Sequence, residues 1–280
     1  MAALSPELLA RHVRRRARAL GATLVRIAPA ARWDEQGEVP RGYRPRDLWS
    51  QAESVIVLGL PILLPVIDTT PSIHYQEQYD TTNRLLDGIA YQLAVQLTER
   101  GHASVSIPRD GYGGLDVLLR NPFAFFSHVM AAKYAGLGAL GLSHNLVTPE
   151  YGPRVRLVSV FTAAPLPPDA MVDQDPCGGC DACARACPVS ALAKRPGEVV
   201  GDLDKDACTR HHQVLKDEAR WPCGVCIKVC PVGRDRRVFG QRSIRPHLEE
   251  RRALAEDPGD PRYAALVHIR RHGSRGDRIA

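Results

Sequence analysis

The chain has 280 residues, of which 44% are hydrophobic, 24% charged and 6% aromatic, and its formal net charge is +6. This composition is that of a globular protein of one large or two modest domains. Its longest apolar stretch, residues 55–67, is too short for a membrane span and contains Pro61 and Pro65. The sequence therefore predicts a protein without a membrane-spanning helix.

The N-terminal residues and the net charge indicate the compartment of the protein and the kind of partner it could bind. Residues 1–10 contain no hydrophobic signal core, so we expect a cytoplasmic protein with reduced thiols. The basic charge permits an acidic partner, such as RNA or an electron donor with an acidic face. Aromatic residues are few and do not alternate with basic ones, so the sequence does not indicate a base-stacking platform.

The first half of the chain alternates predicted helices and strands. Ser5-Pro6-Glu7 is a good helix start, and Gly21 ends that helix, which carries five arginines that we expect on a solvated face. Strands follow at residues 23–27 and 54–60, the second with an apolar run typical of burial on both faces. Leucines at helical spacing from Leu85 to Leu97 predict an amphipathic helix.

Further elements lead to a proline-rich linker. Residues 103–107 read as a short strand, Asn121-Pro122 predicts the start of a helix that runs to Ala135, and residues 155–162 read as a strand. The alternation favours an α/β or α+β layered domain over residues 1–168, with residues 163–168 as its linker. A cysteine-rich domain follows over residues 169–240, and a charged tail of residues 241–280 contains one predicted helix, 263–272, packed back on the body.

Eight cysteines between Cys177 and Cys230 form the most informative pattern. The first four, with Pro188, have the ferredoxin spacing C-x2-C-x2-C-x3-C-P, in which the fourth cysteine ligates the other cluster. The second run ends at Pro231 and has Arg220 where its first cysteine belongs, and Cys208 is the thiol left to replace it. The pattern predicts two [4Fe–4S] clusters, with ligands Cys177, Cys180, Cys183 and Cys230 for one and Cys187, Cys208, Cys223 and Cys226 for the other.

Disulfides and zinc explain these cysteines less well. Disulfides need an oxidising compartment, and a third cysteine after C-x2-C followed by C-x3-C-P does not suit one tetrahedral ion. A second motif, Gly136-Leu-Gly138-Ala-Leu-Gly141, spells GxGxxG but follows a predicted helix instead of a strand, so it does not predict dinucleotide binding. We expect its glycines to permit a tight turn and a close approach to a flat or bulky group.

The chain resembles the epoxyqueuosine reductase family over residues 5–240. The residues that carry the resemblance are the segment 126–141, Leu146-Val-Thr-Pro-Glu150-Tyr-Gly-Pro-Arg154, the strand 54–61 and the whole cysteine pattern with its isolated Cys208. Members pair a nitroreductase-like, cobalamin-binding α/β domain with a two-cluster ferredoxin-like module, a plan shared with reductive dehalogenases. The resemblance implies an α+β protein in which two clusters pass electrons to a corrinoid.

Two family features are absent from this sequence. The family's proton-donating Asp has no counterpart in Asn121-Pro-Phe-Ala-Phe-Phe126, and the family's helical repeats after the clusters are not found in the forty residues that follow. The chain therefore resembles a short branch of the family. For the missing proton donor the candidates are Tyr134 and His128, with Tyr112 and Tyr151 nearby. The predicted cofactor-binding residues are Gly136, Gly138, Gly141, His144, Arg156 and Arg210.

The main functional hypothesis is an iron–sulfur oxidoreductase that passes electrons through two clusters to a corrinoid, which reduces a small molecule or a modified nucleoside. Its partner would be a one-electron donor such as ferredoxin or flavodoxin, and tRNA is a further candidate substrate. One alternative is a non-catalytic electron carrier or reductive activator for a corrinoid protein. Another is a flavin-dependent reductase, because nitroreductase-like folds commonly hold flavin.

Overall fold

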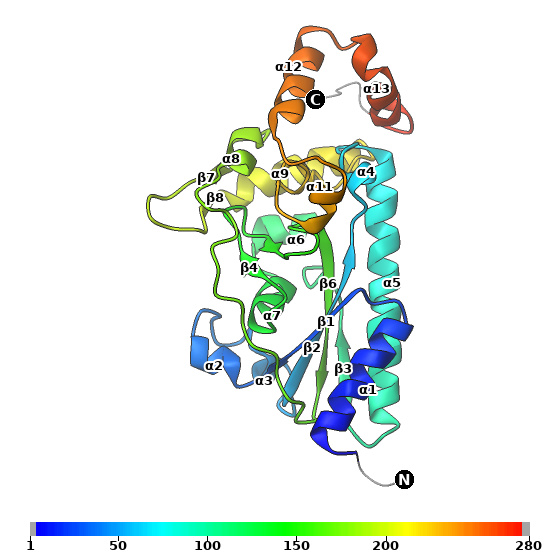
Figure 1. Cartoon of the computed structure of the whole chain (residues 1–280), viewed down its shortest axis with the longest axis vertical. Helices are drawn as coiled ribbons and strands as arrows, with labels where there is room; N and C mark the ends of the chain where they lie inside the picture. The colour runs from blue at the N-terminus through cyan, green and yellow to red at the C-terminus, as the bar shows by residue number, and fades with distance from the viewer. Residues whose placement is uncertain (1–3, 276–280) are drawn as a thin grey trace.

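The computed structural model describes residues 4–275, which form an α+β arrangement around one four-stranded sheet (Figure 1). All strand pairs in this sheet are antiparallel, and the strand order is β1-β2-β6-β3. The strands are β1 (Leu24–Pro29), β2 (Ser54–Pro61), β3 (Ser104–Ile107) and β6 (Val155–Thr162). The α+β class predicted from the sequence is confirmed.

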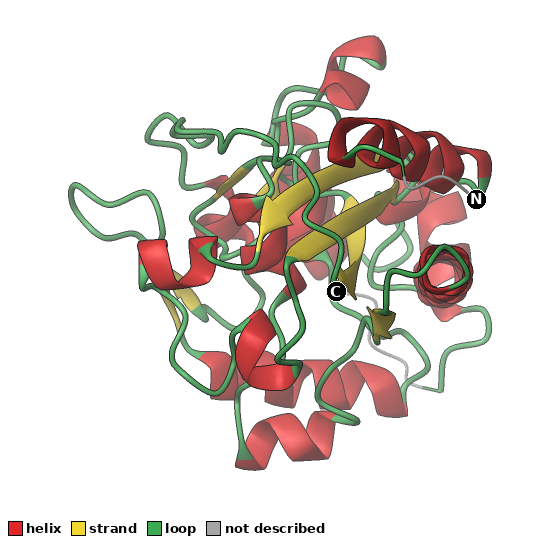
Figure 2. Ribbon diagram, turned by 90° about the horizontal axis from the view of Figure 1, so that it is seen from below, coloured by secondary structure: helices red, strands yellow, loops and turns green. Residues whose placement is uncertain are grey.

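The two central strands, β2 and β6, are buried on both faces, which the near-continuous apolar run of β2 predicts. Ile56 and Leu58 of β2 pack with the helices α1 and α5, whereas Val55 and Val57 belong to the core on the opposite face. Helices therefore cover both sides of the sheet, as the view along the molecule in Figure 2 shows. The first face carries α1 (Pro6–Ala19) and α5 (Ile73–Thr98), and the second carries α2 (Arg32–Gln36), α3 (Pro45–Leu48) and α7 (His128–Tyr134).

Shorter elements and the cysteine-rich segment lie at one end of this sheet (Figure 1). Between the sheet and that segment lie α4 (Leu64–Ile67), α6 (Leu115–Arg120) and the hairpin of β4 (Ala139–Leu140) and β5 (Leu146–Val147). The segment contains α8 (Ala182–Ala186), β7 (Leu192–Ala193), β8 (Asp202–Leu203), α9 (Lys205–Asp217), α10 (Val225–Lys228) and α11 (Arg234–Val238). The chain continues through α12 (Arg245–Glu256), η1 (Pro261–Tyr263) and α13 (Ala264–Arg271).

Most predicted elements are present, and the first helix is capped as expected: the Ser5 side chain accepts a hydrogen bond from the Leu8 amide. The predicted helix from Asn121 to Ala135 is wrong at its start. Asn121 ends α6, residues 121–127 are not helical, and α7 begins at His128 behind the N-cap Ser127, which accepts from the Met130 amide. The Asn-Pro pair therefore marks a helix end.

Two helices extend beyond what the sequence predicted. α5 begins at Ile73, twelve residues before the leucine pattern, because Tyr75, Tyr79 and Asn83 form the buried face of its polar first half. α12 was not predicted at all. The predicted helix of the tail is confirmed as α13, and it packs back on the body, since Arg270 donates to the carbonyl oxygens of Thr69 and Thr70. No helix within residues 4–275 combines the length and the apolar character needed to cross a bilayer.

Candidate metal centre and cofactor pocket

The cysteine module places its eight thiols on short helices and the turns between them. All eight cysteines are free thiols. Cys208 lies in the first turn of α9, whose N-cap Asp204 accepts from the Ala207 amide, and Cys226 lies in α10. Arg220, at the position of the absent cysteine, is buried and forms an ion pair with Glu218. The helix α9 thus carries Cys208 into the module in place of a thiol at Arg220.

The thiols influence one another electrostatically, mainly within the two sets of four predicted from the sequence. Burial, together with the thiols of Cys177, Cys230 and Cys180, raises the pKa of the Cys183 thiol to about 12. Burial also raises the pKa of Cys223 to about 12, with added contributions from Cys208 and Cys187. Cys226 is influenced by Cys223 and Cys208, and across the groups by Cys183. We call Cys177, Cys180, Cys183 and Cys230 the first thiol group and Cys187, Cys208, Cys223 and Cys226 the second thiol group.

Both groups receive N–H···S hydrogen bonds, which stabilise thiolate ligands and tune cluster potentials. In the first group, the Leu142 amide lies 3.3 Å from Cys177 Sγ. In the second, the Ala191 amide lies 3.2 Å from Cys187 Sγ, and Asn145 Nδ2 lies 3.6 Å from Cys226 Sγ. Asn145 was missed in the sequence analysis, because nothing in its local pattern marks it as a neighbour of a thiol 81 residues away.

A site for a single metal ion is not found: within the described part of the chain, no three His, Cys, Asp or Glu side chains converge closely enough to hold one ion. A cubane separates its four thiolates more widely than a single zinc ion does, because four iron and four sulfide ions lie between them. Two groups of four thiols that influence one another electrostatically fit two cubanes, each with four cysteine ligands.

The glycine loop contacts the chain's own backbone. A Cβ atom at Gly136, where φ is +74°, would lie 1.9 Å from the carbonyl oxygen of Ala170, and one at Gly138 would lie 2.2 Å from that of Val147. A Cβ atom at Gly141 would approach Cys177 Sγ to 3.3 Å. The glycines therefore permit the close packing expected of them. The groups that pack on them within the described chain are Ala170 just after the linker, Val147 of β5 and Cys177 of the first thiol group.

A cavity of about 490 Å³ lies between the sheet and the cysteine module. This cavity, called the cofactor pocket below, is lined by all four thiols of the second thiol group and by none of the first. Four other residues predicted as site candidates also line it: Tyr112, His128, His144 and Arg156. Gly136, Gly138, Gly141, Tyr134 and Arg210 are not among its lining residues, and the exposed Arg210 pairs with Asp206 one helical turn away.

Arg156 is fixed in the wall of the cofactor pocket by three neighbours. Its Nε donates to Asn83 Oδ1 at 2.9 Å, its Nη2 lies 3.3 Å from Asp110 Oδ1, and its guanidinium stands 4.3 Å from the centre of the Tyr79 ring. The Tyr79 ring in turn meets Trp221 edge-on at 4.8 Å. A line of contacting groups therefore crosses the pocket wall from Arg156, at the start of β6, to Trp221, two positions before Cys223.

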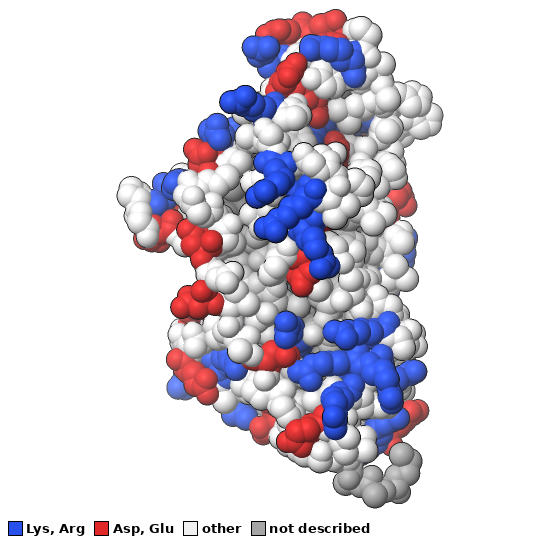
Figure 3. Space-filling view, viewed as in Figure 1, with Lys and Arg blue, Asp and Glu red and all other residues white. Residues whose placement is uncertain are grey.

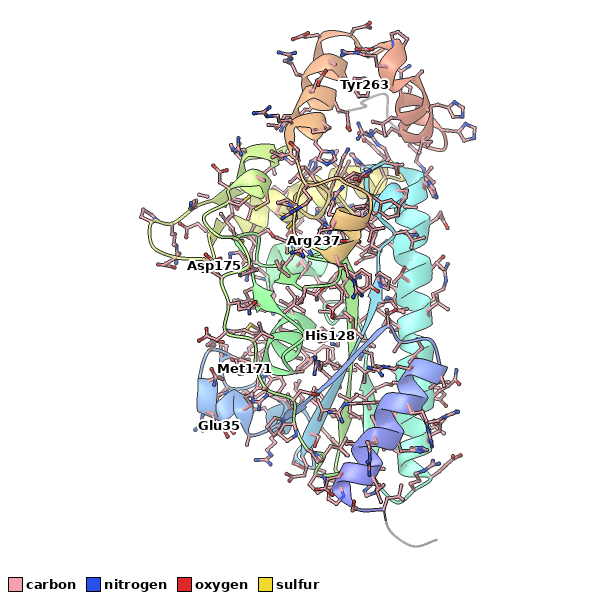
Figure 4. All side chains as sticks on the ribbon, in the orientation of Figure 1. Glu35, His128, Met171, Asp175, Arg237 and Tyr263 are labelled. Carbon is pink, nitrogen blue, oxygen red and sulfur yellow. The ribbon has the colours of Figure 1, made fainter. Side chains whose placement is uncertain are left out.

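Burial holds His128 and two tyrosines at the pocket in their neutral forms. His128 (Figure 4) has Nδ1 2.9 Å from Ser159 Oγ and Nε2 3.0 Å from the Pro108 carbonyl oxygen. The carbonyl can only accept, so Nε2 carries the proton, and burial lowers the pKa of His128 to about 4. Burial raises the pKa values of Tyr79 and Tyr112 above the ordinary range, so both phenols keep their protons. Tyr134 lies elsewhere and donates to Glu38.

A buried arginine joins the sheet to the cysteine module. Arg154, immediately before β6, is completely buried, and it donates to both carboxylate oxygens of Asp235 at 2.7 Å. It also donates to the carbonyl oxygens of Cys230 at 3.0 Å and Val232 at 2.6 Å. In the sequence, Arg154 only ends the segment 146–154 that carries the family resemblance. In the structure its side chain bonds to atoms of the cysteine module: Asp235 and the carbonyl oxygens of Ile227, Cys230 and Val232.

Comparison with known proteins identifies the module and its relatives. A model of the 4Fe–4S dicluster domain matches residues 172–234. A tetrachloroethene reductive dehalogenase of Sulfurospirillum multivorans is 37% identical over 114 residues, which are 37% of this chain and 23% of the relative. An epoxyqueuosine reductase of Listeria monocytogenes is 30% identical over 154 residues, 51% of this chain and 37% of the relative.

The fold is also that of a solved protein. The structure of a catabolic reductive dehalogenase superposes with a TM-score of 0.67 and 21% identity, covering 96% of this chain and 39% of that one. Each of these matches spans less than two fifths of the relative. The resemblance and the iron–sulfur module predicted from the sequence are confirmed: over part of its length the chain is similar both to epoxyqueuosine reductases and to reductive dehalogenases, and it contains a 4Fe–4S dicluster domain.

Proposed function

We propose that the protein is an iron–sulfur reductase in which two [4Fe–4S] clusters deliver electrons to a corrinoid held in the cofactor pocket. The observation that carries the proposal is the lining of this pocket, where the second thiol group forms one wall and Arg156, Tyr79 and His128 stand on others. One solved relative is described as carrying out B12-dependent dehalogenation. A nitroreductase-like ancestry of the layered domain is part of the same proposal.

The ligand assignment follows the two thiol groups. Cys177, Cys180, Cys183 and Cys230 hold the first cluster, and Cys187, Cys208, Cys223 and Cys226 hold the second. Since only the second group lines the pocket, the second cluster is the one adjacent to the cofactor, and electrons enter at the first.

The pocket has the properties of a cofactor site. Its volume lies in the range of small-molecule sites, and part of it is the space that the second thiol group encloses. Apolar side chains such as Ile62, Leu115 and Leu146 line it together with few polar groups. The buried Nε1 atom of Trp221, a lining residue, has no hydrogen-bond partner within residues 4–275, so a donor is free for a bound group. A corrinoid bound there would supply a cobalt centre able to reduce a substrate.

The chain's own residues would position the substrate and hold a proton. Tyr79 and Tyr112 both line the pocket and remain protonated, so we assign proton delivery to this pair in preference to Tyr134, whose hydroxyl donates to Glu38. Arg156 orients Tyr79 through its ring contact, and His128 braces the wall as a neutral imidazole. The substrate is proposed to be a small molecule or a modified nucleoside.

Anaerobic reconstitution tests the proposal. We expect eight irons and eight acid-labile sulfides per chain in this assignment, and a bound corrinoid after incubation with hydroxocobalamin and gel filtration. Arg156→Met should weaken corrinoid retention, whereas Arg120→Met, at the end of α6 with an exposed side chain that does not line the pocket, should leave it unchanged. Flavin in place of corrinoid would identify a flavin-dependent reductase, and tight association with a separate corrinoid protein would identify an electron carrier. Either result would contradict the proposal.

A further inference from the structure

A second hollow, of about 700 Å³, lies beside the first thiol group and shares no lining residue with the cofactor pocket. Its wall includes Pro176 and Pro231, the immediate neighbours of Cys177 and Cys230. It also includes Gly138 and Val147 from the loop and strand that pack on the first thiol group. This surface is therefore the approach to the first thiol group that does not pass through the cofactor pocket.

Three exposed arginines line this hollow: Arg234 and Arg237 on α11, and Arg242 just after it. Within residues 4–275 none of the three guanidinium groups forms an ion pair, although many of the other arginines do. Basic side chains gather on this face of the molecule in Figure 3, and Figure 4 labels Arg237 on α11. Unpaired exposed charges of one sign produce a field that reaches beyond the surface.

The backbone beneath these arginines is fixed before any partner arrives. The amides of Arg234 and Asp235 donate to the carbonyl oxygens of Pro149 and Glu150, at 3.0 and 3.1 Å. Asp235 is also held by the buried Arg154, which contacts the Cys230 carbonyl. The position of α11 is thus tied to a ligand of the first cluster, so a protein that docks on α11 is held at a defined position relative to that cluster.

An apolar contact stands next to the charges. Val238 is 73% exposed and Phe239 is 58% exposed, at and just after the end of α11. Complexes of electron-transfer proteins are small and short-lived, and charged residues around a limited apolar contact steer the partners together. The set Arg234, Arg237, Val238, Phe239 and Arg242, called the α11 face below, has both parts.

We propose that the α11 face docks a small acidic one-electron carrier protein, a ferredoxin or a flavodoxin, which reduces the first cluster. In this step the carrier loses one electron and the cluster gains one, and no bond is made or broken. The inference rests on the proposed function only for the presence of the first cluster, and it does not require a corrinoid. The exposed Val238 and Phe239 beside the charges, and the link from α11 through Arg154 to Cys230, fit a folded acidic redox protein better than RNA.

The test compares two variants with equal changes of charge. Arg237→Glu/Arg242→Glu reverses two charges on the α11 face, and Arg11→Glu/Arg18→Glu reverses two exposed charges on α1. The reconstituted proteins are titrated with an oxidised acidic [2Fe–2S] ferredoxin and with oxidised flavodoxin, and binding is measured by calorimetry at low and high salt. In parallel, stopped-flow absorbance follows cluster reduction by reduced ferredoxin, by reduced flavodoxin and by reduced methyl viologen, a small cationic donor.

We expect the α11 variant to bind the carrier at least tenfold more weakly at low salt, to lose most of the salt dependence, and to accept electrons from the carrier correspondingly more slowly. The α1 variant should behave as the wild type. Both variants should keep their iron content and their rate with methyl viologen, which separates a docking defect from a failure of cluster assembly. A preference between ferredoxin and flavodoxin identifies the carrier.

Three results would overturn the inference. Equal binding by the two variants would do so, as would a greater loss in the α1 variant. The third is competition at the α11 face by unfractionated tRNA with no binding of either carrier, which would identify the surface as an RNA site. A protein that reduces its clusters through the α11 face but binds no corrinoid would sink the proposed function alone.

Discussion

Near the second thiol group, the cysteine module differs from the ferredoxin pattern at two positions. Arg220 stands where the pattern has a cysteine, and it is buried with Glu218 as its ion-pair partner. Cys208, twelve residues earlier on α9, supplies the thiol instead. The electrostatic influence of Cys208 on Cys223 and Cys226 places these three thiols together. Because Cys208 lies on α9, its thiol is positioned by a helix and not by a loop between cysteines.

We predict that Cys208→Ser removes one cluster and leaves the other. Iron should fall to about half, because only the second group loses a thiolate. We expect the two reduced clusters of the wild type to interact through their spins and to broaden its EPR spectrum, and the variant to show the simpler spectrum of an isolated cluster. Thr209→Ala, the next residue of α9, is the control. A full complement of iron in Cys208→Ser would remove Cys208 from the ligand set.

His128 gives a prediction about pH. Its pKa is lowered from 6.5 to about 4 by burial, so the unfolded chain binds a proton that the folded chain rejects. Stability from the neutral imidazole is complete above pH 6.5 and is lost as the pH falls from 6.5 towards 4, by roughly 3 kcal/mol in all. Between pH 7.5 and 5.5 the loss from this one residue should be about 1.3 kcal/mol.

The measurement compares urea unfolding of the wild type and His128→Asn at both pH values under anaerobic conditions. Burial also lowers the pKa values of His212 and His247 to about 4, so both proteins should lose stability in acid, and the difference between them isolates His128. The same pH dependence in the two proteins would show that His128 already accepts a proton in the folded state.

At the scale of elements, buried ionic and polar contacts join the parts of the structure as well as apolar ones. Arg154 ties the start of β6 to α11, and α6 packs against α9 where it closes the cofactor pocket. The sequence could predict the bounds of β6, because most of its residues are apolar or β-branched. It could not predict that the arginine before the run is buried, since its partner Asp235 lies 81 residues away.

Arg154→Met should strongly destabilise the contact between the sheet and the module. The substitution leaves the carboxylate of Asp235 buried without its main partner, which costs about 3 kcal/mol or more. We expect a lower urea midpoint for the bleaching of the cluster absorbance. Arg154→Met/Asp235→Asn should recover part of the loss, because the unpaired charge is removed. If the double variant is less stable than Arg154→Met, the loss does not come from an unpaired charge.

Features encoded in neighbouring residues were predicted well, and features that depend on distant partners or on polar buried faces were not. Strands β2 and β6, the first helix and the cysteine spacing are encoded in neighbouring residues, and each was predicted close to its observed bounds. The start of α5 was missed because its buried face consists of tyrosines and Asn83, which carry no hydrophobic period. The false helix at Asn121 followed from a local signal that fits the end of α6 as well as the start of a helix.

At the scale of the whole molecule, the C-terminal helices form a brace over the cysteine module. Glu250 of α12 lies between Lys228 of α10, at 2.9 Å, and Arg270 of α13, which also donates to the Thr69 and Thr70 carbonyls. All three charged groups are largely buried. Because Lys228 sits between Cys226 and Cys230, the brace acts on the segment that carries ligands for both proposed clusters.

Glu250→Gln should therefore lower the thermal stability of the clusters without altering their number. Two buried cations lose their shared carboxylate, a change that costs a few kcal/mol in such settings. The midpoint of absorbance bleaching on heating should fall, with iron at the start unchanged. Glu249→Gln, on the exposed side of α12, should have little effect, since its partner Arg262 is exposed as well. Equal effects of the two substitutions would contradict the bracing role.

The two arginines that flank Val155 set a limit on how the molecule can move. Arg154 donates hydrogen bonds to the cysteine module. Arg156, two residues further along the extended backbone, lies in the wall of the cofactor pocket. Two residues of strand span about 7 Å of covalent backbone. The cysteine module and the cofactor pocket are therefore joined by a short, fixed segment of backbone, and we expect the distance between the proposed second cluster and the proposed cofactor to stay constant. On this proposal, electron flow would be controlled where the carrier docks or the substrate enters.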